Sequence, residues 1–339
     1  MKNVVLLSFL LLLTTLVGAQ GFSATPLTDF QPGQLYLNAF QGTLYEGSNS
    51  APADHDSDGR NAAQRVQPLD SVGHPSPFGK IVVVGIGMSN WTDELCDSRT
   101  QCISQSFLGT SVKDPQVNHK TLIIVDCAKP GQVADRWLDD HFLNYSYCKS
   151  QLQRQGVTEA QVQVVLYKNA LENPSQPLKS NTVCTATSRV EACHYEHLVG
   201  VTARFLKTRY RNIQQMFLHS RIYAGYAKPH TLDPEPFAYE YGFATKWLIE
   251  AQIQQVRTGI VDDTAGRLDY ASAPWIAWGP YFWASGATPR NDGLTWLPQD
   301  YSLSDMTHPS PSAVAKVSGM MVNFYLHSPF STWYSANGH

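Results

Sequence analysis

The stretch K-I-V-V-V-G-I-G-M-S-N, Lys80 to Asn90, decides the fold of this chain. Four β-branched residues run into two glycines and then a single serine, Ser89. A short apolar run bounded by glycine is typical of a strand buried inside a parallel sheet. Functional residues of such sheets gather beyond the carboxyl ends of the strands. The stretch therefore predicts a buried strand with Ser89 at its functional end, either as an ordinary strand exit or as a nucleophile.

Apolar and amphipathic segments alternate from this stretch to the C-terminus. Short apolar runs predict strands at residues 80–86, 121–127, 162–167, 215–222 and 274–278. Helical periodicity between them predicts helices at residues 135–155, 192–211, 237–257 and 310–327. Strands that alternate with amphipathic helices indicate βαβ units, so the fold class is α/β, with a central parallel sheet covered by helices on both faces.

The composition is that of a globular protein. The chain has 339 residues, of which 43% are hydrophobic and 16% are charged, and its net charge is -3. This length allows one large domain, or one domain with a small extension. The charge is nearly balanced and no basic cluster is present, so nucleic acid is not an expected partner.

The first residues have the layout of a secretory signal peptide. Lys2 precedes a long apolar run that ends in Val17-Gly18-Ala19, and small residues at this place predict cleavage after Ala19. A retained N-terminal anchor is the alternative, because the run approaches membrane-spanning length. We expect residues 1–19 to be the signal peptide and the mature protein to be secreted or periplasmic, with no membrane association. Residues 20–78 are predicted to form an extension packed on the main domain, residues 79–339.

Six cysteines fit an oxidising compartment. Their order along the chain suggests local pairing of Cys96 with Cys102, Cys127 with Cys148, and Cys184 with Cys193. No C-x-x-C pair occurs, which argues against a structural zinc site. We therefore expect disulfides and no metal held by cysteine.

A D-x-x-H motif, Asp305 to His308, lies near the C-terminus and directly before Ser310-Pro311. Serine followed by proline is typical of a helix start, so the motif is expected in a loop that leads into a helix. A carboxylate at this spacing can orient the imidazole, and a serine nucleophile requires such an oriented base. The motif alone is common, but Ser89 after the first strand gives it a partner.

At this point the sequence resembles the SGNH hydrolases, also called GDSL-type esterases and lipases. The family has a serine after the first strand, a glycine after the second, an asparagine after the third, and D-x-x-H before the last helix. The corresponding residues here are Ser89, Gly131, Asn169 and the pair Asp305 and His308. The resemblance implies a flavodoxin-like three-layer α/β/α sandwich with a central parallel sheet. It also implies a catalytic triad of Ser89, Asp305 and His308.

The resemblance further implies that the Ser89 backbone N–H, the Gly131 N–H and the Asn169 side-chain amide form an oxyanion hole. The chain departs from the family at several positions: Met88 replaces the usual aspartate, and Tyr167 and Ala170 flank Asn169 in place of glycine and aspartate. The resemblance therefore implies a divergent member of the family. No cofactor is expected for such a mechanism.

The sequence also contains the start of a calcium-binding loop. Asp54, Asp56, Asp58 and Gly59 match the pattern D-x-D-x-D-G, but the twelfth position is Arg65 and not the required glutamate. An acidic surface turn is the alternative to a calcium site.

An aromatic segment, residues 274–296, lies between the last predicted strand and the D-x-x-H motif. Trp278, Tyr281 and Trp283 are candidates for substrate binding, because aromatic faces stack on sugar rings; the alternative is a hydrophobic core beneath a long loop. The leading interpretation is a secreted serine esterase that hydrolyses carboxylic esters, with acetylated carbohydrates among its candidate substrates. The second is a catalytically silent glycan-binding protein on the same fold.

Overall fold

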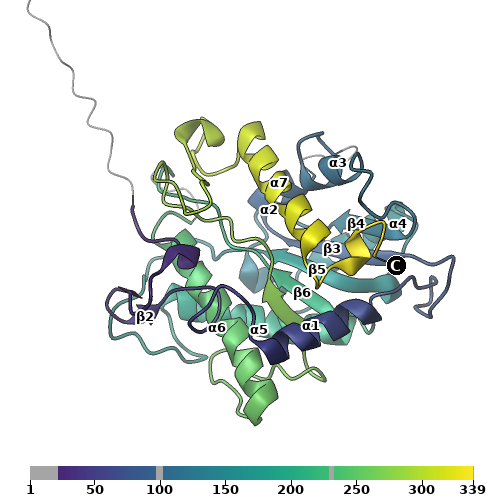
Figure 1. Cartoon of the computed structure of the whole chain (residues 1–339), viewed down its shortest axis with the longest axis horizontal. Coiled ribbons are helices and arrows are strands. Elements are labelled where there is room, and N and C mark those ends of the chain that lie inside the picture. Colours follow the sequence, from purple (N-terminus) through teal and green to yellow (C-terminus); the bar gives the residue numbers. More distant parts are fainter. Residues whose placement is uncertain (1–21, 97–101, 229–232, 339) are drawn as a thin grey trace, which may run out of the picture.

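A computed structural model of the chain describes residues 22–96, 102–228 and 233–338 (Figure 1). The predicted signal peptide lies outside the described residues. The core is a five-stranded sheet in the order β4-β3-β5-β6-β7, and every neighbouring pair of its strands is parallel. The strands are β3 (Ile81–Gly87), β4 (Leu122–Asp126), β5 (Val162–Lys168), β6 (Gln215–Leu218) and β7 (Trp275–Trp278). The predicted α/β fold with a central parallel sheet is confirmed.

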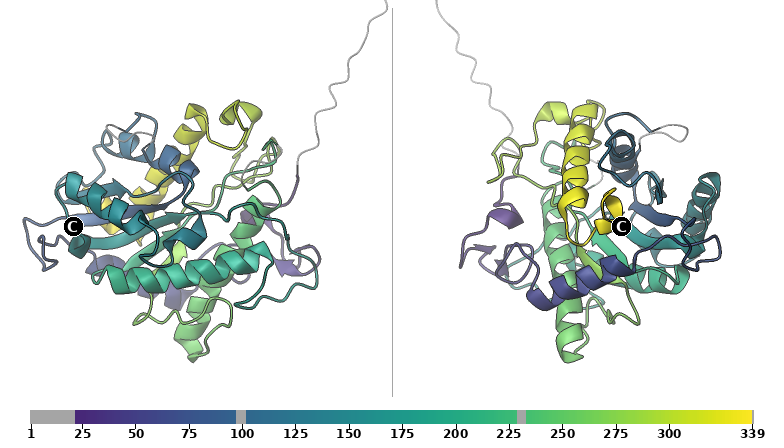
Figure 2. Two further views of the ribbon diagram at one scale, coloured as in Figure 1. Left: turned by 180° about the vertical axis from the view of Figure 1, so that it is seen from behind. Right: turned by 45° about the vertical axis from the view of Figure 1, so that its right-hand side comes forward.

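Helices cover both faces of this sheet, which makes a three-layer α/β/α sandwich. They are α1 (Ala53–Arg65), α2 (Ser89–Leu95), α3 (Phe107–Ser111), α4 (Asn144–Arg154), α5 (Glu191–Arg209), α6 (Phe237–Thr258) and α7 (Pro311–His327). On one face α2 and α3 lie beside α7, and Phe217 of β6 packs against Tyr325 of α7 (Figure 1). On the opposite face α5 packs against α6, and Gln252 of α6 accepts a hydrogen bond from the Ile276 N–H of β7 (Figure 2).

The strands β3 and β5 are buried along their whole length, as continuous apolar runs in a parallel sheet require. In the register of the sheet Val84 lies between Val125 and Val165. Gly87 is the last residue of β3, and its backbone lies close to the neighbouring strand β5. A Cβ atom at this position would lie 2.1 Å from the Lys168 carbonyl oxygen. The glycine is therefore required by close packing of β3 against β5.

The predicted helix at residues 135–155 is wrong in its middle. The chain forms a short 3-10 helix, Ala134–Trp137, and α4 begins only at Asn144. Between them the Asp139 carboxylate accepts a hydrogen bond from the His141 N–H at 2.7 Å. Such local side-chain bonds compete with helical hydrogen bonds, so the helix is interrupted there. The predicted strand at 215–222 is also too long, because β6 ends at Leu218.

The extension forms more regular structure than its composition suggests. It contains a 3-10 helix (Leu27–Asp29), a short antiparallel pair of β1 (Leu35–Tyr36) and β2 (Phe40–Gln41), and the helix α1, which the sequence analysis missed. The buried residues of α1 are His55, Gly59, Ala62 and Ala63. These residues give almost no apolar periodicity, so the sequence pattern did not reveal the helix. Tertiary packing holds it: the His55 ring stacks on Trp275 at 5.0 Å.

The same helix excludes the calcium interpretation. The residues of the D-x-D-x-D-G pattern lie in α1, so they do not form the loop that wraps a calcium ion. Their carboxylates have protein partners instead. Asp54 pairs with Arg257, Asp56 pairs with Arg60, and Asp58 accepts a hydrogen bond from the Tyr270 hydroxyl at 2.7 Å.

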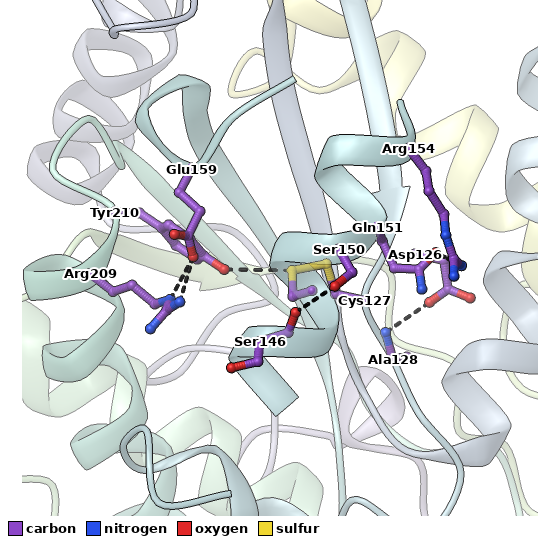
Figure 3. The surroundings of a disulfide bond; sticks show 11 residues. Asp126, Cys127, Ala128, Ser146, Ser150, Gln151, Arg154, Glu159, Arg209 and Tyr210 are labelled. Atoms are coloured by element: carbon purple, nitrogen blue, oxygen red, sulfur yellow. Dashed lines mark hydrogen bonds and ion pairs between the residues drawn. A yellow bond between two sulfur atoms is a disulfide. The ribbon is translucent and has the colours of Figure 1, made fainter. Parts of the chain in front are cut away.

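The three predicted cysteine pairs are confirmed as disulfides. The bond between Cys127 and Cys148 joins the residue after β4 to the middle of α4 (Figure 3). The Tyr210 hydroxyl lies 3.6 Å from the Cys148 sulfur, and the whole disulfide is buried. This bond anchors the start of the loop that follows β4, which carries Gly131. No helix within the described ranges is long and apolar enough to cross a membrane.

Candidate active site

Ser89 is the first residue of α2, at the carboxyl end of β3. The preceding Met88 has an extended backbone, with φ -106° and ψ -163°, so the chain turns from strand to helix within one residue. The first N–H groups of a helix have no partner inside the helix. The Ser89 N–H therefore belongs to the group of backbone donors that point away from α2 at its start. Ser89 itself is 9% exposed.

Asp305 and His308 lie in the loop that leads into α7, as the sequence predicts. Pro311 is the first residue of α7. The loop is fixed by backbone hydrogen bonds from Ser302 N–H to the His308 carbonyl at 2.8 Å and from Ser310 N–H to the Asp300 carbonyl at 2.9 Å. Lys228 adds a bond from its Nζ to the Ser304 carbonyl at 2.9 Å. These contacts hold the loop in one conformation against the end of the sheet.

The structure brings Ser89, His308 and Asp305 into one hydrogen-bonded chain. The Ser89 Oγ lies 2.8 Å from His308 Nε2, and His308 Nδ1 lies 2.9 Å from Asp305 Oδ2. With its proton on Nδ1, the imidazole donates to the carboxylate, and Nε2 is left to accept the serine hydroxyl. Ser89 and His308 are 219 positions apart in the sequence. This arrangement is the one in which a serine, a histidine and an aspartate act as nucleophile, base and orienting group.

The Asp305 carboxylate is held in its charged form. Burial by itself raises its pKa, but the backbone N–H groups of His308 and Thr307 donate to Oδ1 at 2.9 and 2.8 Å and outweigh that effect. The result is a pKa lowered to about 2. Asp305 therefore stays ionised at all but strongly acidic pH, which is the state needed to orient and stabilise an imidazolium.

The loop that carries Gly131 is bonded both to Asn169 and to the end of β3. The Asn169 amide donates to the Gln132 carbonyl at 3.3 Å, and its Oδ1 accepts from the Ala170 N–H at 2.9 Å. The loop after β4 is bonded to β3 through the Lys129 N–H and the Gly87 carbonyl, which are 3.1 Å apart. The carboxyl ends of β3, β4 and β5 thus place the three proposed donors at one edge of the sheet.

Gly131 occupies its position for a backbone reason. Its φ is +73°, a region that side chains with a Cβ rarely adopt, and no atom lies within 4 Å of the place where a Cβ would be. A left-handed residue is needed to turn the loop toward Asn169.

Three further residues at this site were not singled out from the sequence. The buried Asn90 donates its amide to the Thr307 carbonyl at 3.0 Å and so joins α2 to the Asp305–His308 loop. Glu94 of α2 and Lys168 at the end of β5 form a fully buried ion pair. Burial is the main cause that lowers the pKa of Lys168, to about 8, and raises the pKa of Glu94. The polar position beside Asn169, at the end of an apolar strand, was the available signal for Lys168.

The three aromatic candidates for substrate binding are core residues. Trp278, Tyr281 and Trp283 are buried, and each polar atom has a protein partner. The Trp278 Nε1 donates to the Leu44 carbonyl, the Tyr281 hydroxyl accepts from the Leu27 N–H, and the Trp283 Nε1 donates to Glu235. Their rings hold the N-terminal segment on the sheet. The substrate-binding interpretation of these three residues is therefore wrong, and the alternative of a hydrophobic core is correct.

Metal-binding side chains do not converge at this site or elsewhere in the part of the chain that the structure describes, where no group of three or more His, Cys, Asp or Glu residues is suited to a metal ion. The side chains that the structure brings into one hydrogen-bonded chain at the carboxyl edge of the sheet are those of Ser89, His308 and Asp305.

Comparisons with known proteins give distant similarity only. No family model matches the chain, and no curated protein sequence matches it. Among solved structures, the YxiM protein of Bacillus subtilis aligns with a TM-score of 0.36 and 9% identity, over 74% of this chain. The chain spans 57% of that protein.

Two other solved structures are similarly distant. An Arabidopsis thaliana protein aligns with a TM-score of 0.36 and 10% identity, over 72% of this chain and 99% of its own. The salicylyl-acyltransferase SsfX3, from a tetracycline biosynthetic pathway, aligns with a TM-score of 0.33 and 12% identity, over 76% of this chain and 58% of its own.

Proposed function

We propose that this protein is a secreted serine esterase that hydrolyses carboxylic esters through Ser89, His308 and Asp305. The observation that carries the proposal is the continuous hydrogen-bonded chain from Ser89 Oγ through His308 to Asp305, at 2.8 and 2.9 Å. The three disulfides support an oxidising compartment, as does the predicted signal peptide.

The reaction proceeds in two halves. The Ser89 oxygen forms a bond to the ester carbonyl carbon while its proton passes to His308 Nε2, and the carbonyl oxygen becomes an oxyanion. The carbon–oxygen bond to the alcohol then breaks, and the alcohol leaves with the proton from His308. Water attacks the acyl-serine in the same way, and the carboxylic acid is released as Ser89 regains its proton.

The oxyanion is stabilised by donors that are already in place before the reaction. In this proposal the Ser89 N–H, the Gly131 N–H and the Asn169 amide point to the developing charge. Preorganised donors of this kind contribute most of the electrostatic stabilisation in acyl transfer. Two of the residues at which the chain departs from the family pattern, Met88 before Ser89 and Ala170 after Asn169, are buried and do not replace any of the three donors.

The experiment combines active-site labelling with an ester panel. A fluorophosphonate probe should label the wild type and the control Ser150→Ala, whose serine lies on the exposed surface of α4, but not Ser89→Ala. The panel contains nitrophenyl esters of increasing acyl length and acetylated sugars, and only the wild type and the control should turn them over. Equal labelling of wild type and Ser89→Ala would exclude Ser89 as the nucleophile.

The glycan-binding alternative has lost its proposed sugar-binding surface, because the aromatic residues proposed to stack on sugars are buried in the core. Hydrolysis of any ester in the panel would exclude a catalytically silent protein.

A further inference from the structure

A pocket of about 470 Å³ lies over α5 and α6 and shares no residue with the proposed catalytic site. Its walls include Glu196 of α5, Trp247 and Glu250 of α6, Asp262 from the loop after α6, and Phe40 of β2. Its volume falls in the range of small-molecule sites, roughly 300–1,000 Å³. Three acidic and two aromatic side chains are among the lining residues.

Glu196 is the unusual residue of this pocket. Its side chain is 3% exposed, and within the described ranges its carboxyl group has neither a hydrogen-bond donor nor a cation as partner. Burial raises its pKa well above the ordinary value, and the nearby charges of Asp262 and Glu250 raise it further. Buried polar groups are almost always hydrogen-bonded, because an unpaired one costs stability. A carboxyl group kept in this position and open to a pocket is suited to a ligand that supplies donors.

The other charges near Glu196 do not neutralise it. Lys246 lies 2.8 Å from Glu250 and also donates to the Tyr45 carbonyl at 3.2 Å, so its charge is engaged on α6. One oxygen of Asp262 accepts from the Thr264 and Ala265 N–H groups, both at 2.8 Å. His197, next to Glu196 on α5, has its Nδ1 on the Thr264 carbonyl at 2.9 Å. The pocket therefore has an excess of acidic groups over cations.

The aromatic walls select the kind of cation. The rings of Phe40 and Trp247 lie 5.6 Å apart, centroid to centroid, and both are partly exposed. Aromatic faces attract organic cations, and their apolar area favours a ligand with a carbon skeleton. The carboxylates of the described chain do not form a group suited to a metal ion. An unpaired carboxyl acceptor is best satisfied by N–H donors, which a primary ammonium group provides.

We propose that this pocket binds a small organic molecule that carries a primary ammonium group, with Glu196 as its main hydrogen-bond acceptor and Trp247 and Phe40 against its carbon skeleton. The proposal is independent of the esterase proposal, since no residue is shared. Burial and the neighbouring acids raise the pKa of the Glu196 carboxyl group, and a bound ammonium group would lower it again, so the group would carry fewer protons in the complex at a pH between the two values. Binding would then release a proton to the buffer.

Isothermal titration calorimetry of the full mature protein tests this. The probes are glucosamine and butylamine, each with an uncharged counterpart, glucose and butanol, and calcium chloride as a separate titrant. We expect heat from the amines alone, with an apparent enthalpy that depends on the ionisation enthalpy of the buffer. In Glu196→Gln the amine affinity should fall roughly 10- to 100-fold, as for a lost charge-assisted hydrogen bond.

The matched control is Glu172→Gln, which removes an exposed acid outside the pocket and should bind the amines as the wild type does. Glu196→Gln should unfold at the same or a higher temperature than wild type, because it replaces an unpaired buried acid with a neutral group. If Glu196→Gln is poorly folded, Asp262→Asn provides the second test and should weaken amine binding several-fold.

The proposal is overturned by equal binding of glucose and glucosamine, which would indicate a neutral sugar site. Calcium binding that competes with the amines would overturn it in favour of a metal site. Absence of heat with both amines, or unchanged amine affinity in Glu196→Gln, would also overturn it. None of these results bears on labelling of Ser89.

Discussion

Two acid–base pairs involve helix α2, one through Ser89 and the other through Glu94, and they differ in their access to water. The Asp305 and His308 side chains are 26% and 37% exposed, whereas those of Glu94 and Lys168 are 0% exposed. The first pair meets the Ser89 hydroxyl, and the second fastens α2 to the end of β5. A pair at the edge of the solvent can pass protons to a substrate and back. A buried pair instead holds two elements in a fixed relation, since each partner loses its hydrogen-bonded counter-charge if the other moves away.

Asp305→Asn is expected to have the largest effect, on turnover. The amide cannot hold the His308 tautomer or stabilise the imidazolium, so kcat on the best ester of the panel should fall roughly 10⁴-fold. The melting temperature should change little, because the pair is partly exposed. Steady-state kinetics with circular dichroism melting checks both. Wild-type turnover in this variant would mean that Asp305 does not serve as the orienting group.

The main expected effect of Lys168→Met is a lower free energy of unfolding. The substitution leaves the Glu94 carboxylate buried without its cation, which costs about 3–5 kcal/mol of unfolding free energy. The double variant Glu94→Leu with Lys168→Met removes both charges and should recover most of the loss. Urea denaturation of the wild type, both single variants and the double variant gives the coupling energy. Additive single effects would show that the two side chains do not act as a pair.

Asn169→Ala separates the oxyanion role from the support that Lys168 gives one residue earlier. Loss of a preorganised donor should lower kcat roughly 10²- to 10³-fold while KM changes by a small factor. The expected pattern is the reverse of that for Lys168→Met: a loss of turnover with little loss of unfolding free energy. A change confined to KM would place Asn169 in substrate binding only.

The smallest expected effect is on the pH dependence of the unfolding free energy, and it comes from a buried imidazole, that of His219. Burial lowers the pKa of the His219 imidazole to about 3, against an opposing hydrogen bond to the Tyr167 carbonyl. The folded-state pKa is depressed, so its contribution to stability is complete above the unfolded value, near 6.5, and is lost as pH falls toward 3. Between pH 7 and pH 5 the wild type should therefore lose about 2 kcal/mol more unfolding free energy than His219→Gln. Parallel stability curves for the two proteins would contradict the assignment of a buried neutral histidine.

The sequence alone predicted the strands of the central sheet, three of the seven helices (α5, α6 and α7) and the disulfide pairing, and it named Ser89, Asp305 and His308 as candidate site residues. These features depend on local patterns: apolar runs, 3.6-residue periodicity, and the order of short motifs along the chain. The catalytic roles of Ser89, Asp305 and His308 stay predictions, although the structure places the three side chains in hydrogen-bond contact. The predicted helix at residues 135–155 was wrong in part, because a local hydrogen bond from the His141 N–H to the Asp139 carboxylate interrupts it.

Other features were decided only by tertiary structure. Helix α1 has small and polar residues on its buried face, so its stability comes from the surface it meets, and its acidic residues are helical ion-pair partners and not calcium ligands. Burial of Trp278, Tyr281 and Trp283 depends on the N-terminal segment that covers them. The pairing of Glu94 with Lys168 and the isolation of Glu196 depend on elements distant in sequence. Periodicity shows which face of an element is apolar, but which charged groups meet, and which are left alone, is settled only when the elements pack.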